Sequence, residues 1–283
     1  MNCPNGLADF SVQRWISPNL GSPDYYNVCA VETMADVGVP QNGYGWQYPK
    51  TGNAYVGIFS NAYPDSDVRE YIQCELTSEL EFGERYVVEF FVSRTDSAGK
   101  APDNVGALLS TNAVFSNGIG FLPYIPQVTN SPSQTLTDDI DWLQIIDTIQ
   151  ANGGEKFLTI GVFNEHTNWI QVDGVIVDDA VLYVDDVSVI KVFEAVLIPN
   201  VFSPNGDGIN DELVISTSGF SDRELSVYNR WGRLIYSEIG TQFSWNGKIE
   251  NVDAADGVYY ILISTQASNN KKVMKKGFVH LLR

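Results

Sequence analysis

Apolar and polar residues alternate in short runs along most of this chain, and such runs are typical of β-strands. In residues 156–163 both alternating sets of side chains are apolar or small, which predicts a strand covered on both faces. Turn-forming residues separate the runs. The runs that predict strands are 54–60, 68–76, 85–93, 105–110, 156–163, 180–192, 212–216, 223–230, 233–238, 257–265 and 272–282.

Two segments depart from this pattern. Residues 138–150 fit a helix, although their several isoleucines are β-branched and disfavour one, and the stretch 142–149 fits a strand at least as well. Residues 1–53 are predicted to be irregular, because proline and glycine interrupt every period. This region is nevertheless rich in aromatic residues. The simplest fold that accommodates all the runs is all-β, with double sheets.

Composition and charge narrow the function. The chain has 283 residues, of which 44% are hydrophobic, enough for two domains with proper cores. Its formal net charge is −18; residues 195–283 hold nine basic and nine acidic residues, which leaves eight basic and 26 acidic residues in 1–194. Such a surface repels nucleic acid and anionic lipid, but it can collect divalent cations.

No membrane-spanning segment or targeting signal stands out in the sequence, and the three cysteines agree with export without proving it. No apolar run reaches the roughly 18 residues of a membrane span, so we expect no direct membrane insertion. No signal peptide precedes Cys3, and we expect one to have been removed from this sequence. Cys3 and Cys29 lie in turn-rich sequence and are candidates for a disulfide. Cys74 alternates with apolar neighbours, which predicts a buried free thiol in a strand.

The C-terminal region carries a series of spaced motifs. Residues 200–212 combine two glycines, a proline and several Asn and Asp residues, which favours a compact loop with positive-φ positions. This loop and the motifs after it resemble the gliding-motility-associated C-terminal domain, the type B sorting signal of the type IX secretion system; only Asn246 departs, where Asp is expected. The motif residues are Asn205, Gly206, Asp207, Gly208, Asn210, Asp211, Asn229, Arg230, Trp231, Gly232, Trp245, Gly257, Tyr259, Gly277 and Arg283.

This resemblance implies an export route. It implies Sec-dependent passage to the periplasm, transfer across the outer membrane, and a final place at the cell surface or outside the cell. The expected partner is the type IX translocon or an outer-membrane β-barrel protein. The lysines at 271, 272, 275 and 276 fit two roles, protection of an exposed sheet edge or part of the face that the export machinery reads.

The preceding region resembles a second family. Its features are a Cys-Pro-Asn-Gly opening, Trp15 before a Ser-Pro pair, residues 52–57 and 153–156, and a closing run at 183–189. In this order they are similar to jelly-roll modules of the carbohydrate-binding-module type that precede sorting domains. The opening strand of such modules has no counterpart here, so another element would fill its place or that strand is absent. The expected domains are a jelly-roll β-sandwich at 1–192, a linker at 193–199 and a small immunoglobulin-like β-sandwich at 200–283.

Catalytic residues are scarce. The two histidines are His166, in a turn, and His280, in the last predicted strand. No Gly-x-Ser-x-Gly elbow accompanies them, and no other nitrogen or thiolate ligands are grouped for zinc. We therefore predict a non-enzymatic protein. A glycoside hydrolase remains an alternative because carboxylates are abundant.

Binding residues are easier to suggest. Tyr44, Trp46 and Tyr48 share one parity in a glycine-rich loop and form the first candidate for a glycan platform, with Trp15 and Trp169 as further candidates. Taken alone, each ring is more often part of the core than of a ligand platform, because Trp is buried on average. A structural calcium ion is the inorganic candidate, and the predicted ligands are Asp173, Asp178, Asp179, Asp185 and Asp186.

The loop 205–211 superficially echoes a calcium loop but lacks the spacing of an EF-hand, so its side chains are expected to bond their own backbone. The resulting hypothesis is a secreted, non-enzymatic cell-surface protein with an N-terminal binding or adhesive module and a C-terminal sorting domain. The module's partners would be a glycan or other surface proteins. The alternative is a structural subunit of a surface assembly without a glycan ligand.

Overall fold

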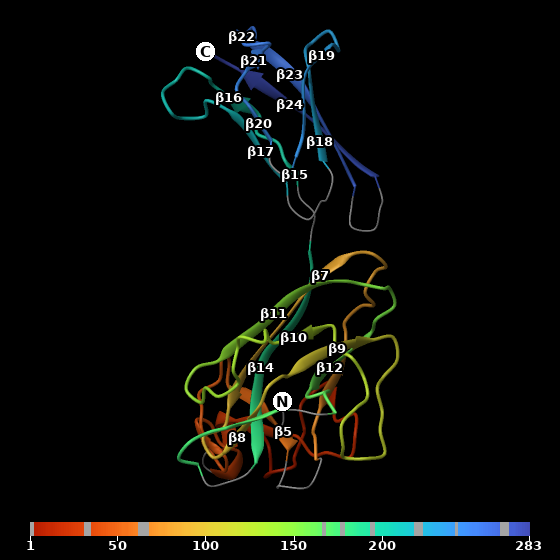
Figure 1. Cartoon of the computed structure of the whole chain (residues 1–283), viewed down its shortest axis with the longest axis vertical. Coiled ribbons are helices and arrows are strands. Elements are labelled where there is room, and N and C mark those ends of the chain that lie inside the picture. The colour runs from red at the N-terminus through yellow and green to blue at the C-terminus, as the bar shows by residue number, and fades with distance from the viewer. Residues whose placement is uncertain are drawn as a thin grey trace. The chain divides into compact units, whose positions relative to one another are not determined.

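The computed structural model describes residues 3–30, 35–61, 68–165, 168–175, 179–192, 196–217, 223–240, 243–266 and 272–283. They form an all-β protein, as predicted; the helical segments in the described part are two 3-10 turns, Val28–Ala30 and Ala35–Val37. The chain divides into two compact units, Met1–Phe82 with Tyr86–Ile190, and Gly83–Arg85 with Lys191–Arg283 (Figure 1). Among the described residues, no helix has the length and apolar character needed to cross a membrane.

Two five-stranded sheets form the first unit, with strand orders β1-β6-β12-β9-β10 and β11-β7-β14-β5-β2. Two short pairs, β3 with β4 and β8 with β13, lie outside these sheets. The strands are β1 (Trp15–Ile16), β2 (Asp24–Asn27), β3 (Gln41–Asn42), β4 (Gly45–Trp46), β5 (Ala54–Asn61), β6 (Ile72–Glu75), β7 (Arg85–Arg94), β8 (Lys100–Pro102), β9 (Gly106–Ser110), β10 (Val128–Thr129), β11 (Leu143–Gln150), β12 (Phe157–Gly161), β13 (Trp169–Gln171) and β14 (Ala180–Lys191).

One hydrophobic core joins the two large sheets. In β7 every second residue, Val88, Phe90 and Val92, is buried, and these side chains pack with apolar residues of the other sheet such as Leu158 and Ile160. Burial of each large apolar side chain stabilises the fold by about 1.5–3 kcal/mol. The result is the predicted jelly-roll sandwich. Strand β12 is buried on both faces, as the sequence indicated for 156–163.

The structure corrects two of the secondary-structure predictions. Residues 143–150 form strand β11, so the helical reading of 138–150 is wrong: Ile145 is buried and its neighbour Ile146 is exposed, as in a strand. The prediction of an irregular 1–53 is also wrong in part, because β2 is a buried edge strand of the second sheet. Its polar residues have internal partners, since the Tyr26 hydroxyl donates to Asp24 Oδ2 at 3.2 Å.

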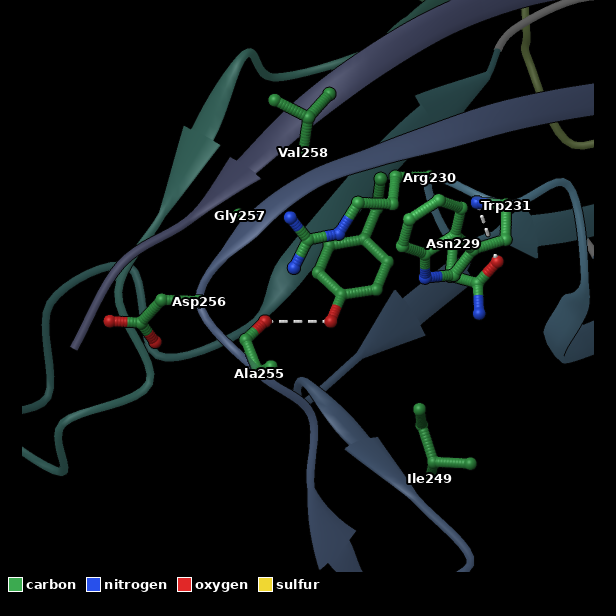
Figure 2. Close-up of a pocket in the computed structure, with 9 residues that line it drawn as sticks. Asn229, Arg230, Trp231, Ile249, Ala255, Asp256, Gly257 and Val258 are labelled. Carbon is green, nitrogen blue, oxygen red and sulfur yellow. Dashed lines mark hydrogen bonds between the residues drawn. The ribbon is translucent and has the colours of Figure 1, made fainter.

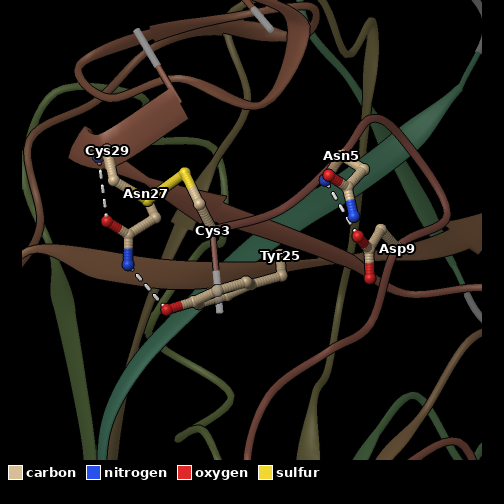
Figure 3. Close-up of a disulfide and its surroundings, with 6 residues drawn as sticks. All are labelled: Cys3, Asn5, Asp9, Tyr25, Asn27 and Cys29. Carbon is tan, nitrogen blue, oxygen red and sulfur yellow. Dashed lines mark hydrogen bonds between the residues drawn. A yellow bond between two sulfur atoms is a disulfide. The ribbon is translucent and has the colours of Figure 1, made fainter. Parts of the chain in front are cut away.

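A disulfide holds the start of the described chain against the end of β2. Cys3 and Cys29 are bonded, with Cα atoms 5.9 Å apart, and they are the pair that the sequence singled out. Figure 3 shows Asn27 beside this bond, where its side chain accepts the Cys29 N–H at 3.0 Å and donates to the Tyr25 hydroxyl at 2.6 Å. Cys74 is a free, half-buried thiol in β6, and burial raises its pKa to about 11.

The second unit is a smaller sandwich. Its sheets have the orders β16-β24-β23-β18-β19 and β15-β17-β20, with a separate pair β21-β22. The strands are β15 (Val196–Leu197), β16 (Val201–Phe202), β17 (Leu213–Thr217), β18 (Arg223–Tyr228), β19 (Leu234–Ile239), β20 (Phe243–Trp245), β21 (Lys248–Ile249), β22 (Val252–Asp253), β23 (Gly257–Gln266) and β24 (Lys272–Leu281).

Aromatic side chains fill the centre of this unit. The fully buried Trp245 contacts Phe202 and Tyr259, with ring centroids 5.4 and 5.1 Å apart. Strand β24 lies between β16 and β23 and pairs with β16 in parallel, with Val201 opposite His280. All other pairings in this sheet are antiparallel. This arrangement is the immunoglobulin-like sandwich expected from the sequence.

Candidate functional site

Strand β4 and the residues that follow it present two aromatic rings to solvent. Trp46 is 51% exposed and Tyr48 is 62% exposed, and their rings lie edge to face with centroids 6.3 Å apart. The residue between them, Gln47, points the other way and is buried. The alternation of a short extended segment therefore places both rings on one outer surface, which we call the Trp46–Tyr48 platform.

Hydrogen bonds fix the backbone of this platform. The Trp46 N–H donates to Asp96 Oδ2 at 2.9 Å, and the Trp142 indole N–H donates to the Tyr48 carbonyl at 2.9 Å. Gln47 Nε2 donates to the Ser93 hydroxyl at 2.8 Å. The two exposed rings are thus held on a segment whose backbone is hydrogen-bonded at Trp46 and Tyr48 and anchored by the buried Gln47 side chain, so little freedom would be lost on binding.

The other predicted glycan residues lie apart from the platform or inside the fold. Tyr44 is half-buried and packs edge to face on Phe59, with centroids 5.4 Å apart, so the predicted shared face of three rings is wrong for this residue. The half-buried Trp169 pairs with Pro102 across β13 and β8. Trp15 lies on β1, where it lines a separate pocket of about 290 Å³ with Asp185 and Asp186.

The predicted calcium ligands are not gathered into one cage. Asp173 is exposed in a turn, whereas Asp179 precedes β14 and Asp185 lies six positions further on, roughly 20 Å along a strand. Asp178 lies outside the described residues. The described part of the chain holds no group of three or more His, Cys, Asp or Glu residues that could bind a metal ion.

The carboxylates of Asp185 and Asp186 already have protein donors. The Lys50 N–H donates to Asp185 Oδ2 at 2.8 Å, and the Thr51 hydroxyl donates to Asp186 Oδ1 at 2.6 Å. Burial raises the pKa of Asp185 to about 6. These two residues hold the turn at Thr51 against β14. The calcium ion stays a prediction, and these contacts give it no support.

A buried acid just before β6 was not found from the sequence. Glu70 accepts the N–H groups of Ser22 and Phe59 at 2.8 and 2.9 Å, and it is 4% exposed. Burial raises its pKa to about 7, and the nearby Asp24 acts in the same direction. Both oxygens of this carboxyl hold backbone together, so its role is structural.

In the second unit, the loop 205–211 bonds its own backbone, as predicted. Asp211 accepts the N–H groups of Gly206 and Gly208 at 2.7 and 2.8 Å. Asp207 accepts the Ile209 N–H, and the hydrogen bonds from Asn205 and Ile209 lower the pKa of Asp207. Its oxygen atoms are therefore used inside the loop, which explains why the resemblance to a calcium loop is superficial.

Most other motif residues also support the fold. Trp245 and Tyr259 are core residues, and a side chain at Gly277 would meet Ile198 at 2.9 Å. The Arg283 guanidinium donates to the carbonyls of Ala254 and Gly247 at 2.5 and 3.1 Å. Packing and hydrogen bonding are enough to explain why these residue types stand at these positions.

Arg230 and Trp231 are different, because they point away from the core at a fixed turn. Asn229 Oδ1 accepts the N–H groups of Trp231 and Arg233, both at 3.0 Å, and so sets the turn after β18. Trp231 is 82% exposed, and the Arg230 guanidinium lies 5.7 Å from its ring centroid. Figure 2 shows both side chains at a pocket of about 200 Å³, which Val258 and Asp256 also line.

Comparisons with known proteins agree with the C-terminal motifs. Residues 196–281 match the family model described as CHU_C type IX secretion signal domain. A type IX secretion signal domain indicates export by that route and association with the cell surface or outer membrane. No curated protein matches the sequence.

Solved structures give weaker similarities. The N-terminal tandem CBM22 domain from Paenibacillus barcinonensis is 11% identical over 96% of this chain and 82% of that chain, with a TM-score of 0.37. A cleaved adhesin domain of Lys-gingipain from Porphyromonas gingivalis is 13% identical over 65% of this chain and 94% of that chain, with a TM-score of 0.31. At these scores no ligand can be transferred to this chain.

Proposed function

Because residues 196–281 are a type IX secretion signal domain, we propose that this chain is a non-enzymatic cell-surface protein whose first unit binds glycan. The Trp46–Tyr48 platform is the observation that carries the binding proposal. The second unit would be recognised by the translocon or by an outer-membrane partner protein. The first unit would then act outside the cell.

The chemistry of the platform suits a sugar. Pyranose rings carry faces of C–H groups, which pack on aromatic rings, and hydroxyls, which need polar partners at the edge. Trp46 and Tyr48 supply the rings on one surface, with the Tyr48 hydroxyl and the Asp96 carboxylate as polar groups nearby. The fixed backbone supports binding without a large ordering cost.

Glycan binding is tested with the full chain on a polysaccharide array, followed by titration calorimetry with each sugar that binds. Trp46→Ala should weaken binding by at least about tenfold, the effect of losing one stacked ring. Phe115→Ala is the matched control, because Phe115 is 69% exposed on the same unit but lies outside the platform. A blank array, or equal affinity for Trp46→Ala and the parent chain, would remove the binding proposal.

Export is tested separately by removal of residues 196–283 in a bacterium with a type IX system. The first unit has its own core and should fold without them. We expect the shortened protein to accumulate in the periplasm, measured by fractionation of periplasm, surface and medium. Normal delivery of the shortened protein to the exterior would disprove the sorting role.

A further inference from the structure

The outward face of the sheet β16-β24-β23-β18-β19 carries a row of aromatic side chains. The register places Tyr228 opposite Tyr260, and Tyr260 opposite Phe278, on three neighbouring strands. Tyr259 and Val279, one position away on two of these strands, are buried, so the row points away from the core. Tyr260 and Phe278 are each 52% exposed.

Apolar neighbours extend this row along the strands. Val258 and Leu262 lie two positions to either side of Tyr260 on the same face of β23. On β24, the His280 ring packs edge to face on Phe278, with centroids 5.8 Å apart. The solvent face of a sandwich sheet is normally polar, and a contiguous apolar patch on such a face marks an interaction site.

The turn after β18 adjoins this row. Tyr228 ends β18 two positions before Arg230, and Val258 lines the pocket that Arg230 and Trp231 share. Within the described part of the chain, the Arg230 guanidinium makes no hydrogen bond or ion pair. A volume of about 200 Å³ leaves room for one side chain from outside. The unpaired cation favours a carboxylate in that position.

The charged residues on the same face also favour an acidic partner. Lys276 stands opposite Leu262 on β24, so cations flank the apolar row at two places. The carboxylate in the pocket, Asp256, is engaged by Arg283, whose guanidinium lies 3.6 Å from it. In the strands β18, β23 and β24 the one acidic residue is Glu224, at the opposite end of β18 from Arg230.

We propose that Tyr228, Arg230, Trp231, Val258, Tyr260 and Phe278 form a docking face for a protein of the export route, which presents carboxylates beside an apolar surface. The inference rests on the proposed sorting role and adds the face and the chemistry of its partner. Residues 195–283 balance nine basic with nine acidic residues, so attraction to an anionic membrane would be weak. A protein surface supplies both the apolar contact and the acidic side chain for the pocket.

The test uses the full chain in a bacterium with a type IX system. Two variants remove the face, Tyr260→Thr with Phe278→Thr, and Arg230→Glu; threonine keeps the β preference of the strands. Each should reduce the fraction of protein outside the cell by at least about tenfold, the effect of losing central contacts of an interface. The purified variants should melt at the temperature of the parent chain.

Matched controls separate docking from general damage. Val214→Thr changes an exposed apolar residue on the sheet β15-β17-β20, and Lys248→Glu reverses a charge on β21. Both should be exported normally. An equal loss of export in either control would overturn the proposed face.

Two further arms distinguish the remaining outcomes. Normal export of the face variants, with periplasmic retention of the chain that lacks 196–283, would overturn the docking face and leave the sorting role intact. Normal export of that shortened chain would overturn both. Binding of the purified full chain to phosphatidylglycerol vesicles, lost in the face variants, would identify a membrane-binding face and overturn a protein partner.

Discussion

Raising the pH should weaken the first unit through the buried carboxyl of Glu70. Burial raises the pKa of this group from its ordinary 4.5 to about 7, although the N–H groups of Ser22 and Phe59 favour the charged form. The desolvation of a charge in the interior therefore outweighs two hydrogen bonds to it. The adjacent Asp24 adds to the cost of ionisation.

The sign and size of the effect follow from this pKa. Because the folded chain holds the Glu70 proton more tightly than the unfolded chain, the contribution to stability is fully present below pH 4.5 and is lost as the pH rises through about 7. At about 1.4 kcal/mol per pKa unit, the difference corresponds to roughly 3 kcal/mol.

Urea unfolding at pH 5 and pH 8, followed by circular dichroism, measures this loss. The parent chain should lose roughly 2.5 kcal/mol more than Glu70→Gln between these values, since glutamine cannot ionise and part of the full difference is already lost at pH 5. Buried acids that do not interact with Glu70, such as Asp185, titrate in both proteins and cancel in the comparison. Glu79→Gln, at an exposed position, controls for the loss of one charge. An identical pH dependence in Glu70→Gln and the parent chain would refute the reasoning.

Further predictions concern the covalent link, the C-terminal arginine and calcium. Replacing Cys3 and Cys29 by serine should lower the free energy of unfolding of the first unit by about 3–4 kcal/mol, because the bond closes a loop with a sequence separation of 26; an unchanged urea midpoint would contradict this. Arg283→Ala should cost the second unit about 2 kcal/mol, read from its thermal melt, since two carbonyls lose a charged donor. Chelation by EDTA should leave the melting temperature unchanged, because Asp185 and Asp186 already bind protein donors; a clear fall would restore the calcium site.

Long strands were predictable from the sequence because alternation alone specifies them. β7, β12, β23 and β24 begin and end within a few residues of the predicted runs. β2 was missed because Asp24 and Asn27, at its two ends, are residue types typical of turns. Only the fold supplies the partners for the hydrogen-bonding groups of these two side chains. Local sequence does not contain that information.

The prediction of the candidate sites failed in one place for a local reason and in another for a long-range reason. Tyr44 and Trp46 share a parity, but Gly45 between them has φ of +146°, outside the strand region, so the alternation breaks and the two rings separate. The row of Tyr228, Tyr260 and Phe278 was invisible because it depends on the register of three strands. Periodicity gives the outward face of each strand but not which residues become neighbours across it.

The position of β24 between β16 and β23 has a consequence for biosynthesis. A nascent chain reaches β24 after the other four strands of this sheet, and until then the sheet has a gap at an interior place, with β16 left without its parallel neighbour. Any chain that stops early, through truncated translation or proteolysis, would therefore lack a readable export label. If the second unit is the sorting domain that we propose, delivery to the cell exterior is conditional on synthesis of the first unit and of β24, the strand that completes the second.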